Sequence, residues 1–217
     1  MMYQSFHRIL FISTLSLGLL SNTKGPNQQD NSAKFLSLFP TIPPLHLHVY
    51  SPAPYYDSVR GKEFMGKKLD STFYGYFSSQ SWSPQSNHYI YACYKFPLSN
   101  NRIGLIVRCP SQYDESAIDL CIWDNSLKKI INSFELADSF GDGGWEFVKD
   151  AWLEDINKTG ELNIITRKQD NWIEENDSPS KKSTTDSLKI YLIKNDYYIP
   201  TIVTVDTNKF KLHDWNH

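Results

Sequence analysis

The chain has 217 residues, of which 40% are hydrophobic and 14% are aromatic, and its formal net charge is −2. A chain of this length and composition can bury a substantial core as one domain, which excludes wholesale disorder. Nucleic acid is a poor partner for it, because binding a phosphate backbone requires an excess of Lys and Arg that the chain does not have.

The N-terminal segment has the features of an export signal. Arg8 precedes the uncharged, largely apolar residues 9–20, and a polar tail with chain-breaking residues follows. The apolar run is too short to span a bilayer core of about 30 Å. We therefore expect residues 1–25 to be a signal peptide, the protein to be secreted or periplasmic, and the mature chain to have no membrane span. A buried N-terminal helix is the alternative.

Residues 26–33 form a polar lead, and we expect residues 34–217 to form a single domain. A short helix is expected at 33–39, with Ser32 as its N-cap and Pro40 as its end. Residues 41–50 contain prolines and should run extended. His46 and His48 alternate in that segment, so they form either half of a metal site or two surface positions.

Short runs of β-branched and aromatic residues alternate with polar turns from residue 73 onward. This pattern predicts a mainly β fold, either an antiparallel sheet or sandwich or an incomplete propeller-like arrangement. Segments 102–138 and 161–208 each read as a strand followed by a hairpin, which suggests a duplicated three-stranded unit; chance similarity of short strands is the alternative. The polar residues 174–186 are expected to form a mobile loop.

The three cysteines, Cys93, Cys109 and Cys121, all fall in predicted strands. We expect them to be buried thiols that act as small hydrophobic residues, with one disulfide and a free cysteine as the alternative. No His or Asn stands in a recognisable partner motif for a catalytic cysteine.

One segment, residues 152–165, carries a chemical signature. Calcium loops place oxygen ligands at alternate positions so that the chain curls around one ion, and a glycine at the sixth position permits the sharp turn. That glycine is Gly160, and the alternate positions hold Asp155, Asn157, Thr159, Glu161 through its carbonyl, and Asn163. The segment resembles the calcium loop of FG-GAP-like extracellular β-propeller blades, a degenerate loop of the EF-hand type. The resemblance implies a bound Ca²⁺.

The loop departs from that pattern in its charge. Thr159 stands where Asp or Asn is usual, Thr166 replaces the bidentate Glu, and Lys158 adds a positive charge. A calcium site here would be weak, because affinity depends on ligand charge. The alternative is a loop held by hydrogen bonds from backbone amides to Asp155 and Asn157. A turn at 137–146 could add Asp138 or Asp142 to the site if residues 145–153 formed a hairpin with it; otherwise it is a solvated turn.

No nucleophile, zinc-protease, phosphate-loop or dinucleotide motif occurs in the chain. The aromatic residues suffice either for a surface that stacks on a sugar or a peptide or for cross-strand packing. They include Tyr74, Tyr76, Phe77, Trp82, Tyr89, Tyr91, Tyr94, Trp145, Trp152 and Trp172. We therefore expect a non-catalytic binding or structural module outside the cytoplasm, with a protein or carbohydrate ligand. The alternative is an extracellular or periplasmic hydrolase that acts on glycans or peptides through an unrecognised site.

Overall fold

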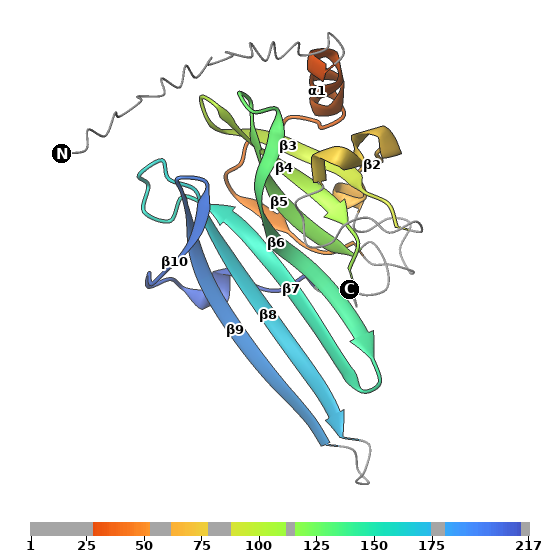
Figure 1. Cartoon of the computed structure of the whole chain (residues 1–217). Coiled ribbons are helices and arrows are strands. Elements are labelled where there is room, and N and C mark those ends of the chain that lie inside the picture. Colours follow the sequence, from red (N-terminus) through yellow and green to blue (C-terminus); the bar gives the residue numbers. More distant parts are fainter. Residues whose placement is uncertain (1–27, 53–61, 78–87, 112–115, 175–180, 214–217) are drawn as a thin grey trace, which may run out of the picture.

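The protein is mainly β, as the sequence pattern predicts, and its strands form one antiparallel sheet (Figure 1). The computed structural model describes residues 28–52, 62–77, 88–111, 116–174 and 181–213. Within them lie the helix α1 (Gln28–Ser37) and the short 3-10 helices η1 (Lys62–Phe64), η2 (Ser71–Phe77) and η3 (Thr207–Lys209). The strands are β1 (Leu47–Val49), β2 (Lys67–Lys68), β3 (Tyr91–Ser99), β4 (Arg102–Cys109), β5 (Ala117–Asp124), β6 (Lys129–Asp142), β7 (Trp145–Glu154), β8 (Asn163–Glu174), β9 (Lys181–Lys194) and β10 (Tyr197–Thr201). No helix of these segments is long and apolar enough to cross a membrane.

The sheet is a meander in which β2 to β10 follow one another in space as they do in the sequence. The two segments suspected of duplication supply β4 to β6 and β8 to β10 of this meander, with β7 between them. They are therefore neighbouring parts of a single sheet and not separate blades. Their common origin stays a hypothesis.

Three boundaries differ from the sequence-based expectation. The helix α1 ends at Ser37, two residues before the expected end at 39. The helix α1 begins at Gln28, so Ser32 lies inside it and is not the N-cap. Gln is a good helix former, which suits Gln28 and Gln29 to the first turn of the helix, ahead of the expected start. Strand β9 begins at Lys181, so the second half of the predicted loop 174–186 is strand. Residues 181–189 of β9 lie beyond the stretch that pairs with β10, so they form an edge of the sheet, where charged and polar residues discourage pairing with other chains.

Strand β6 has 14 residues and belongs to both halves of the sheet. Its first part pairs with β5 as far as Ala137, and its last part, from Asp138 to Asp142, pairs with β7. Beyond the residues of β7 that pair with β6, the short strand β1 pairs with β7 instead, with Val49 opposite Ala151. The chain just before β1 bonds to β3, since Ile42 N donates to Lys95 O at 3.0 Å. Residues 40–49 thus join β3 to β7. We call this closed part of the sheet, together with the helices and segments that pack on it, the body.

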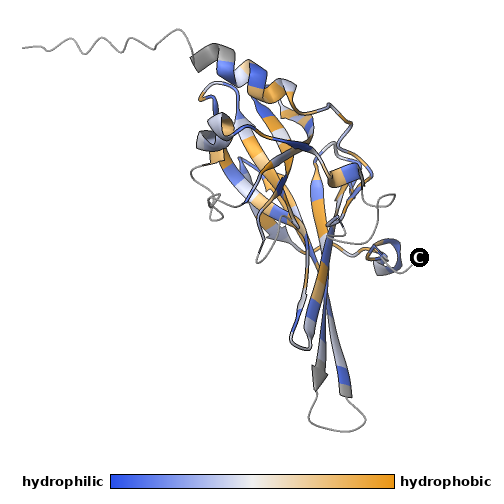
Figure 2. Ribbon diagram, turned by 90° about the vertical axis from the view of Figure 1, so that its right-hand side faces the viewer, coloured by the Kyte–Doolittle hydropathy of each residue, from blue (hydrophilic) through white to orange (hydrophobic). Residues whose placement is uncertain are grey.

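Hydrophobic clusters cover both faces of the body. An inner cluster is built around residues such as Phe96, Ile106, Leu120, Leu153 and Ile164. On one outer face, Phe35 of α1 packs against Trp123 with ring centroids 5.4 Å apart, together with the aromatic residues of η2. On the other, Phe210 of the C-terminal segment packs against Trp152 at 5.3 Å. Figure 2 shows these hydrophobic stretches gathered in the body of the protein.

The C-terminal hairpin of β9 and β10 returns to the start of β4 and closes the inner cluster at that end. Arg102 bonds both carboxylate oxygens of Asp196 at 2.7 Å and also contacts Asp124 at 2.7 Å. The hydroxyl of Tyr198 donates to Leu120 O at 2.9 Å. The bidentate arginine pairing fixes the direction in which this hairpin folds back.

A buried carboxylate marks the point at which β6 leaves β5 for β7. Asp138 is 5% exposed and accepts hydrogen bonds from Ser111 Oγ at 2.6 Å and Ser116 Oγ at 2.7 Å. Ser139 N also donates to it, at 2.8 Å. Burial raises the pKa of Asp138 above its ordinary value, although the hydrogen bonds from the serines oppose that shift.

The free energy of unfolding should therefore vary with pH through Asp138. Because its pKa is raised in the folded state, the folded protein keeps this proton at pH values where the unfolded chain has lost it. The contribution of Asp138 to stability should fall as the pH rises from the ordinary carboxyl range through the raised pKa. Asp138→Asn should remove this component, and chemical denaturation between about pH 3 and pH 7 measures it. Asp142→Asn, on an exposed position of the same strand, is the matched control. Identical pH profiles for the wild type and Asp138→Asn would contradict the assignment.

Candidate ligand-binding surface

Four strand ends extend beyond the body as a narrow projection, which we call the arm (Figures 1 and 2). It consists of residues 138–142 of β6, 145–149 of β7, 168–172 of β8 and 183–187 of β9, paired in register. Phe140 lies opposite Phe147, and Trp145 lies opposite Trp172. Paired residues of antiparallel strands share a face, so these four rings lie on one side of the arm. We call this side the aromatic face.

The rings of the aromatic face hold one another in place. The Trp145 ring lies 5.3 Å from Phe140, 5.5 Å from Phe147 and 5.4 Å from Trp172 between centroids. The two indoles are stacked, with 24° between their planes. Each such pair contributes about 0.5–1.5 kcal/mol beyond the burial of its area. The pairing therefore fixes both indoles in the absence of a ligand.

The aromatic face continues the inner face of the body but lies outside the buried clusters of the described residues. Ala151 and Leu153, the next residues of β7 on that face, belong to the inner cluster. Trp172 is 49% exposed, an unusual value for a tryptophan that stacks on another. Tryptophan is enriched at interfaces, so the stack with one half-exposed indole makes this face the candidate binding surface.

Polar groups border the exposed indole on the same face. Lys168 Nζ lies 2.8 Å from Asp170 and 4.5 Å from the centroid of Phe147. Ser183 is paired with Trp172, and Thr185 is paired with Asp170. This border offers hydroxyl, ammonium and carboxylate groups that can donate or accept hydrogen bonds beside a flat ring.

The opposite face of the arm is polar. Asn171 Nδ2 donates to Glu146 Oε1 at 3.0 Å, and Thr184 Oγ1 donates to Asn171 Oδ1 at 2.8 Å. Successive residues of a strand alternate between the two faces, so the arm has one aromatic and one hydrogen-bonded polar side. This asymmetry makes the aromatic face the candidate functional surface.

The other described aromatic residues that the sequence singles out contact side chains outside the arm. Lys68 Nζ lies 3.0 Å from the ring centroid of Tyr89, and the Arg108 guanidinium lies 3.6 Å from that of Tyr91. Trp152 is on the other face of β7, where it packs against the C-terminal segment. Tyr76 packs on α1, and Trp82 lies outside the described residues. Of the predicted stacking residues, Trp145 and Trp172 are brought together.

The Asp155 loop is held by its own backbone amides. Thr159 N donates to Asp155 Oδ1 at 3.0 Å and Gly160 N to Asp155 Oδ2 at 2.7 Å. Gly160 adopts a φ of 83°, as the calcium-loop pattern expects of its glycine. Asn163 is buried and accepts from Ile156 N at 3.3 Å. The contacts of Asp155 are those of the hydrogen-bonded alternative, and the second side chain that accepts from a backbone amide is Asn163 and not Asn157.

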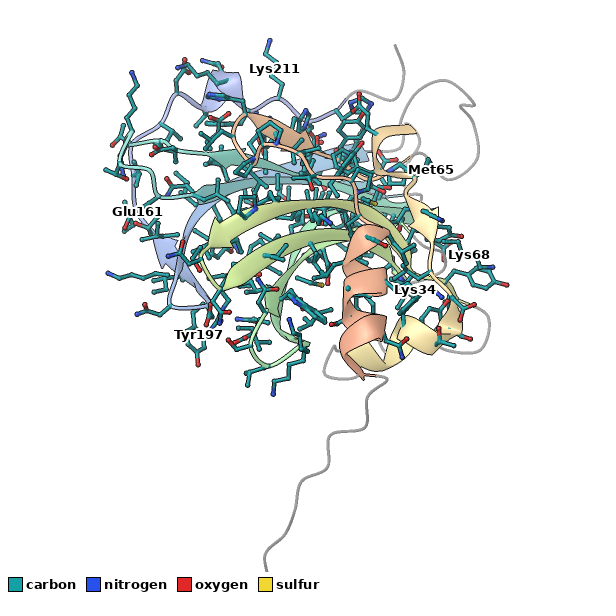
Figure 3. All side chains as sticks on the ribbon, turned by 90° about the horizontal axis from the view of Figure 1, so that it is seen from above. Lys34, Met65, Lys68, Glu161, Tyr197 and Lys211 are labelled. Carbon is teal, nitrogen blue, oxygen red and sulfur yellow. The ribbon has the colours of Figure 1, made fainter. Side chains whose placement is uncertain are left out.

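The remaining predicted ligands of this loop are exposed. Asn157, Thr159 and Glu161 all reach solvent, and Figure 3 shows Glu161 at the margin of the protein. Residues 138–142 do form a hairpin with β7, but it cannot add a ligand to this loop. Asp142 and Asp155 lie at opposite ends of β7, which at about 3.3 Å per residue separates them by roughly 30 Å. Asp138 lies opposite Lys149, six residues before Asp155, which separates them by roughly 20 Å. The suggestion that Asp142 or Asp138 supplies charge there is therefore wrong.

His46 and His48 each find a carboxylate on the neighbouring strand. His48 Nε2 lies 2.8 Å from Asp150 Oδ2, and His46 Nδ1 lies 2.8 Å from Glu154 Oε2. Asp150 is 1% exposed, and its Oδ2 also accepts from His213 N at 2.6 Å. Within the described ranges, no three His, Cys, Asp or Glu side chains gather as a metal centre. Nothing in the local sequence indicates these pairs, because β1 and β7 are about a hundred residues apart.

A carboxylate that orients an imidazole is also the geometry of a general base. His48, however, stacks on Trp152 with ring centroids 4.5 Å apart, and its contacts tie β1 to β7. Two shallow concavities of about 470 and 480 Å³ lie elsewhere, one beside Arg102 and Asp196 and the other between β9 and residues 200–203. The pair of His48 and Asp150 lines neither of them.

The three cysteines are buried and free, as the sequence predicts for strand thiols. Burial raises the pKa of the Cys93 thiol to about 12 and raises those of Cys109 and Cys121 as well. A thiol reacts as its thiolate, so none of the three is a nucleophile at neutral pH.

Comparison with known protein families, with curated proteins and with solved structures gives no match to this chain.

Proposed function

We propose that this protein is a non-catalytic binding module that acts outside the cytoplasm and that its ligand docks on the aromatic face of the arm. The observation that carries the proposal is the preformed stack of Trp145 and Trp172, in which the Trp172 side is 49% exposed. Tryptophan in an ordered, partly exposed setting is a frequent energetic centre of binding surfaces. The export signal expected at residues 1–25 is consistent with a ligand met outside the cell.

The arm is also shaped for recognition. Its strands extend the ladder of β6 to β9 away from the body, so a ligand can reach the aromatic face without opening the core (Figure 1). The surface is carried by paired strands and not by loops, so its residues keep their relative positions. The hydrolase alternative has less support, because the pair of His48 and the buried Asp150 serves to attach β1 to β7.

Binding should depend on Trp172 and not on exposed aromatic residues elsewhere. We expect Trp172→Ala to weaken ligand binding at least about thirtyfold, the effect of losing about 2 kcal/mol at an interface centre. Arrays of immobilised peptides and glycans, probed with labelled wild-type and variant protein, measure this. Tyr197→Ala is the matched control, since Tyr197 is 67% exposed on β10 and lies at the margin of the protein (Figure 3). Signals that Trp172→Ala leaves unchanged would contradict the proposal.

We also propose that the Asp155 loop binds Ca²⁺ weakly, in the millimolar range of extracellular modules. An ion that binds only the folded state must raise the melting temperature. We expect a higher melting temperature in millimolar calcium than in chelator for the wild type, and no such difference for Asp155→Ala. In chelator, Asp155→Ala should still cost about 1 kcal/mol, because two backbone amides lose their acceptor. A wild-type melting temperature that is the same in calcium and in chelator would contradict the calcium proposal and leave Asp155 with the structural role alone.

A further inference from the structure

We propose that the ligand of the aromatic face is a neutral glycan, one of whose pyranose rings stacks on the exposed indole of Trp172. This inference rests on the proposed function above and names the ligand class of the same surface. It follows from the size of the exposed aromatic area, from the polar groups around it and from the pairing of charges on this face.

The exposed aromatic area is the size of a ring and not of a protein interface. About half of Trp172 is exposed, while the other three rings are partly buried. A tryptophan presents at most about 250 Å², so the open part is on the order of 120 Å². A stable protein partner covers about 800 Å² on each side. The area therefore fits a small flat group better than a folded partner.

The border of Trp172 matches the rim of a sugar. A pyranose has a C–H face that packs on an aromatic ring and an equatorial rim of hydroxyls that both donate and accept. Ser183 lies directly across from Trp172, within about 5 Å between Cβ atoms, and Asp170 lies two residues along the same face. An apolar peptide side chain on the indole would take water from these groups without replacing its hydrogen bonds.

The charges of the face favour a neutral ligand. Lys168 contacts Asp170, and Lys149 contacts Glu135, each pair with its charged atoms 2.8 Å apart. A polyanion would have to compete with these carboxylates for both lysines. The surface is thus suited to hydroxyl-rich chains and not to sulfated or uronic acid-rich chains or to nucleic acid.

The preformed stack compensates for the weakness of a single sugar contact. Trp145 is fixed by Phe140 and Phe147, and Trp172 is fixed by Trp145. Binding therefore orders few side chains, which reduces the entropic cost that limits weak ligands. Repetition along a polysaccharide can then raise the apparent affinity, because neighbouring units replace one another on the same indole.

The test is native affinity electrophoresis of the full chain in gels that contain cellulose ether, xylan, mannan or starch as neutral polymers and heparin or alginate as polyanions. We expect at least one neutral polymer to retard the wild type, no retardation by the polyanions, and an affinity for the neutral polymer that Trp172→Ala lowers at least about thirtyfold. Trp172→Phe should retain part of the binding, and Tyr197→Ala should retain all of it. Thermal melting of each variant shows that it is folded.

Three outcomes would overturn the inference. They are the absence of retardation by every neutral polymer, retardation that is stronger in the polyanions, and retardation that Trp172→Ala leaves intact. Binding of array peptides that is lost in Trp172→Ala, without any glycan binding, would overturn the glycan inference while supporting the proposed function. If Trp172→Ala left the binding of every ligand unchanged, both the glycan inference and the proposed function would be overturned.

Discussion

The continuity of β6 is the constraint on which the rest of the structure depends. One strand pairs with β5 in the body and with β7 in the arm, so the two halves of the sheet cannot move independently without breaking a ladder. The change of partner leaves the body end of β7 unpaired on one side. Strand β1 fills that place, and backbone groups that would otherwise be orphaned are satisfied.

The same constraint explains the buried polar groups. Asp138 sits where β6 changes partner, and its carboxylate accepts hydrogen bonds from Ser111 Oγ, Ser116 Oγ and the backbone Ser139 N. Asp150 and His48 hold β1 against β7. The inner face of the body then runs on into the arm, where it bears Trp145 and Trp172 without a covering cluster among the described residues. The face of the sheet that covers the inner cluster in the body is therefore exposed in the arm, where it is available to a ligand.

Local patterns were sufficient for the strands, the buried thiols of Cys93, Cys109 and Cys121, and the turn at Gly160, because each depends on nearby residues. They also selected Trp145 and Trp172, but within a larger set of aromatic residues. Register between β7 and β8 brings those two together, and register is a property of the whole sheet. The pairing of His48 with Asp150 could not be predicted either, because it depends on β1 pairing with β7, which no periodicity of the sequence indicates. The end of α1 was easier to locate than its start. Pro40 marks the end, whereas the polar residues at the start give no apolar pattern to recognise.

The continuous sheet holds the two indoles stacked before a ligand arrives. Circular dichroism of the ligand-free protein tests it most directly, because two stacked indoles give an exciton couplet. We expect a couplet that disappears equally in Trp145→Phe and Trp172→Phe and survives in Trp152→Phe, which alters the opposite face of β7. A spectrum without a couplet, or a couplet that survives both substitutions in the arm, would contradict it.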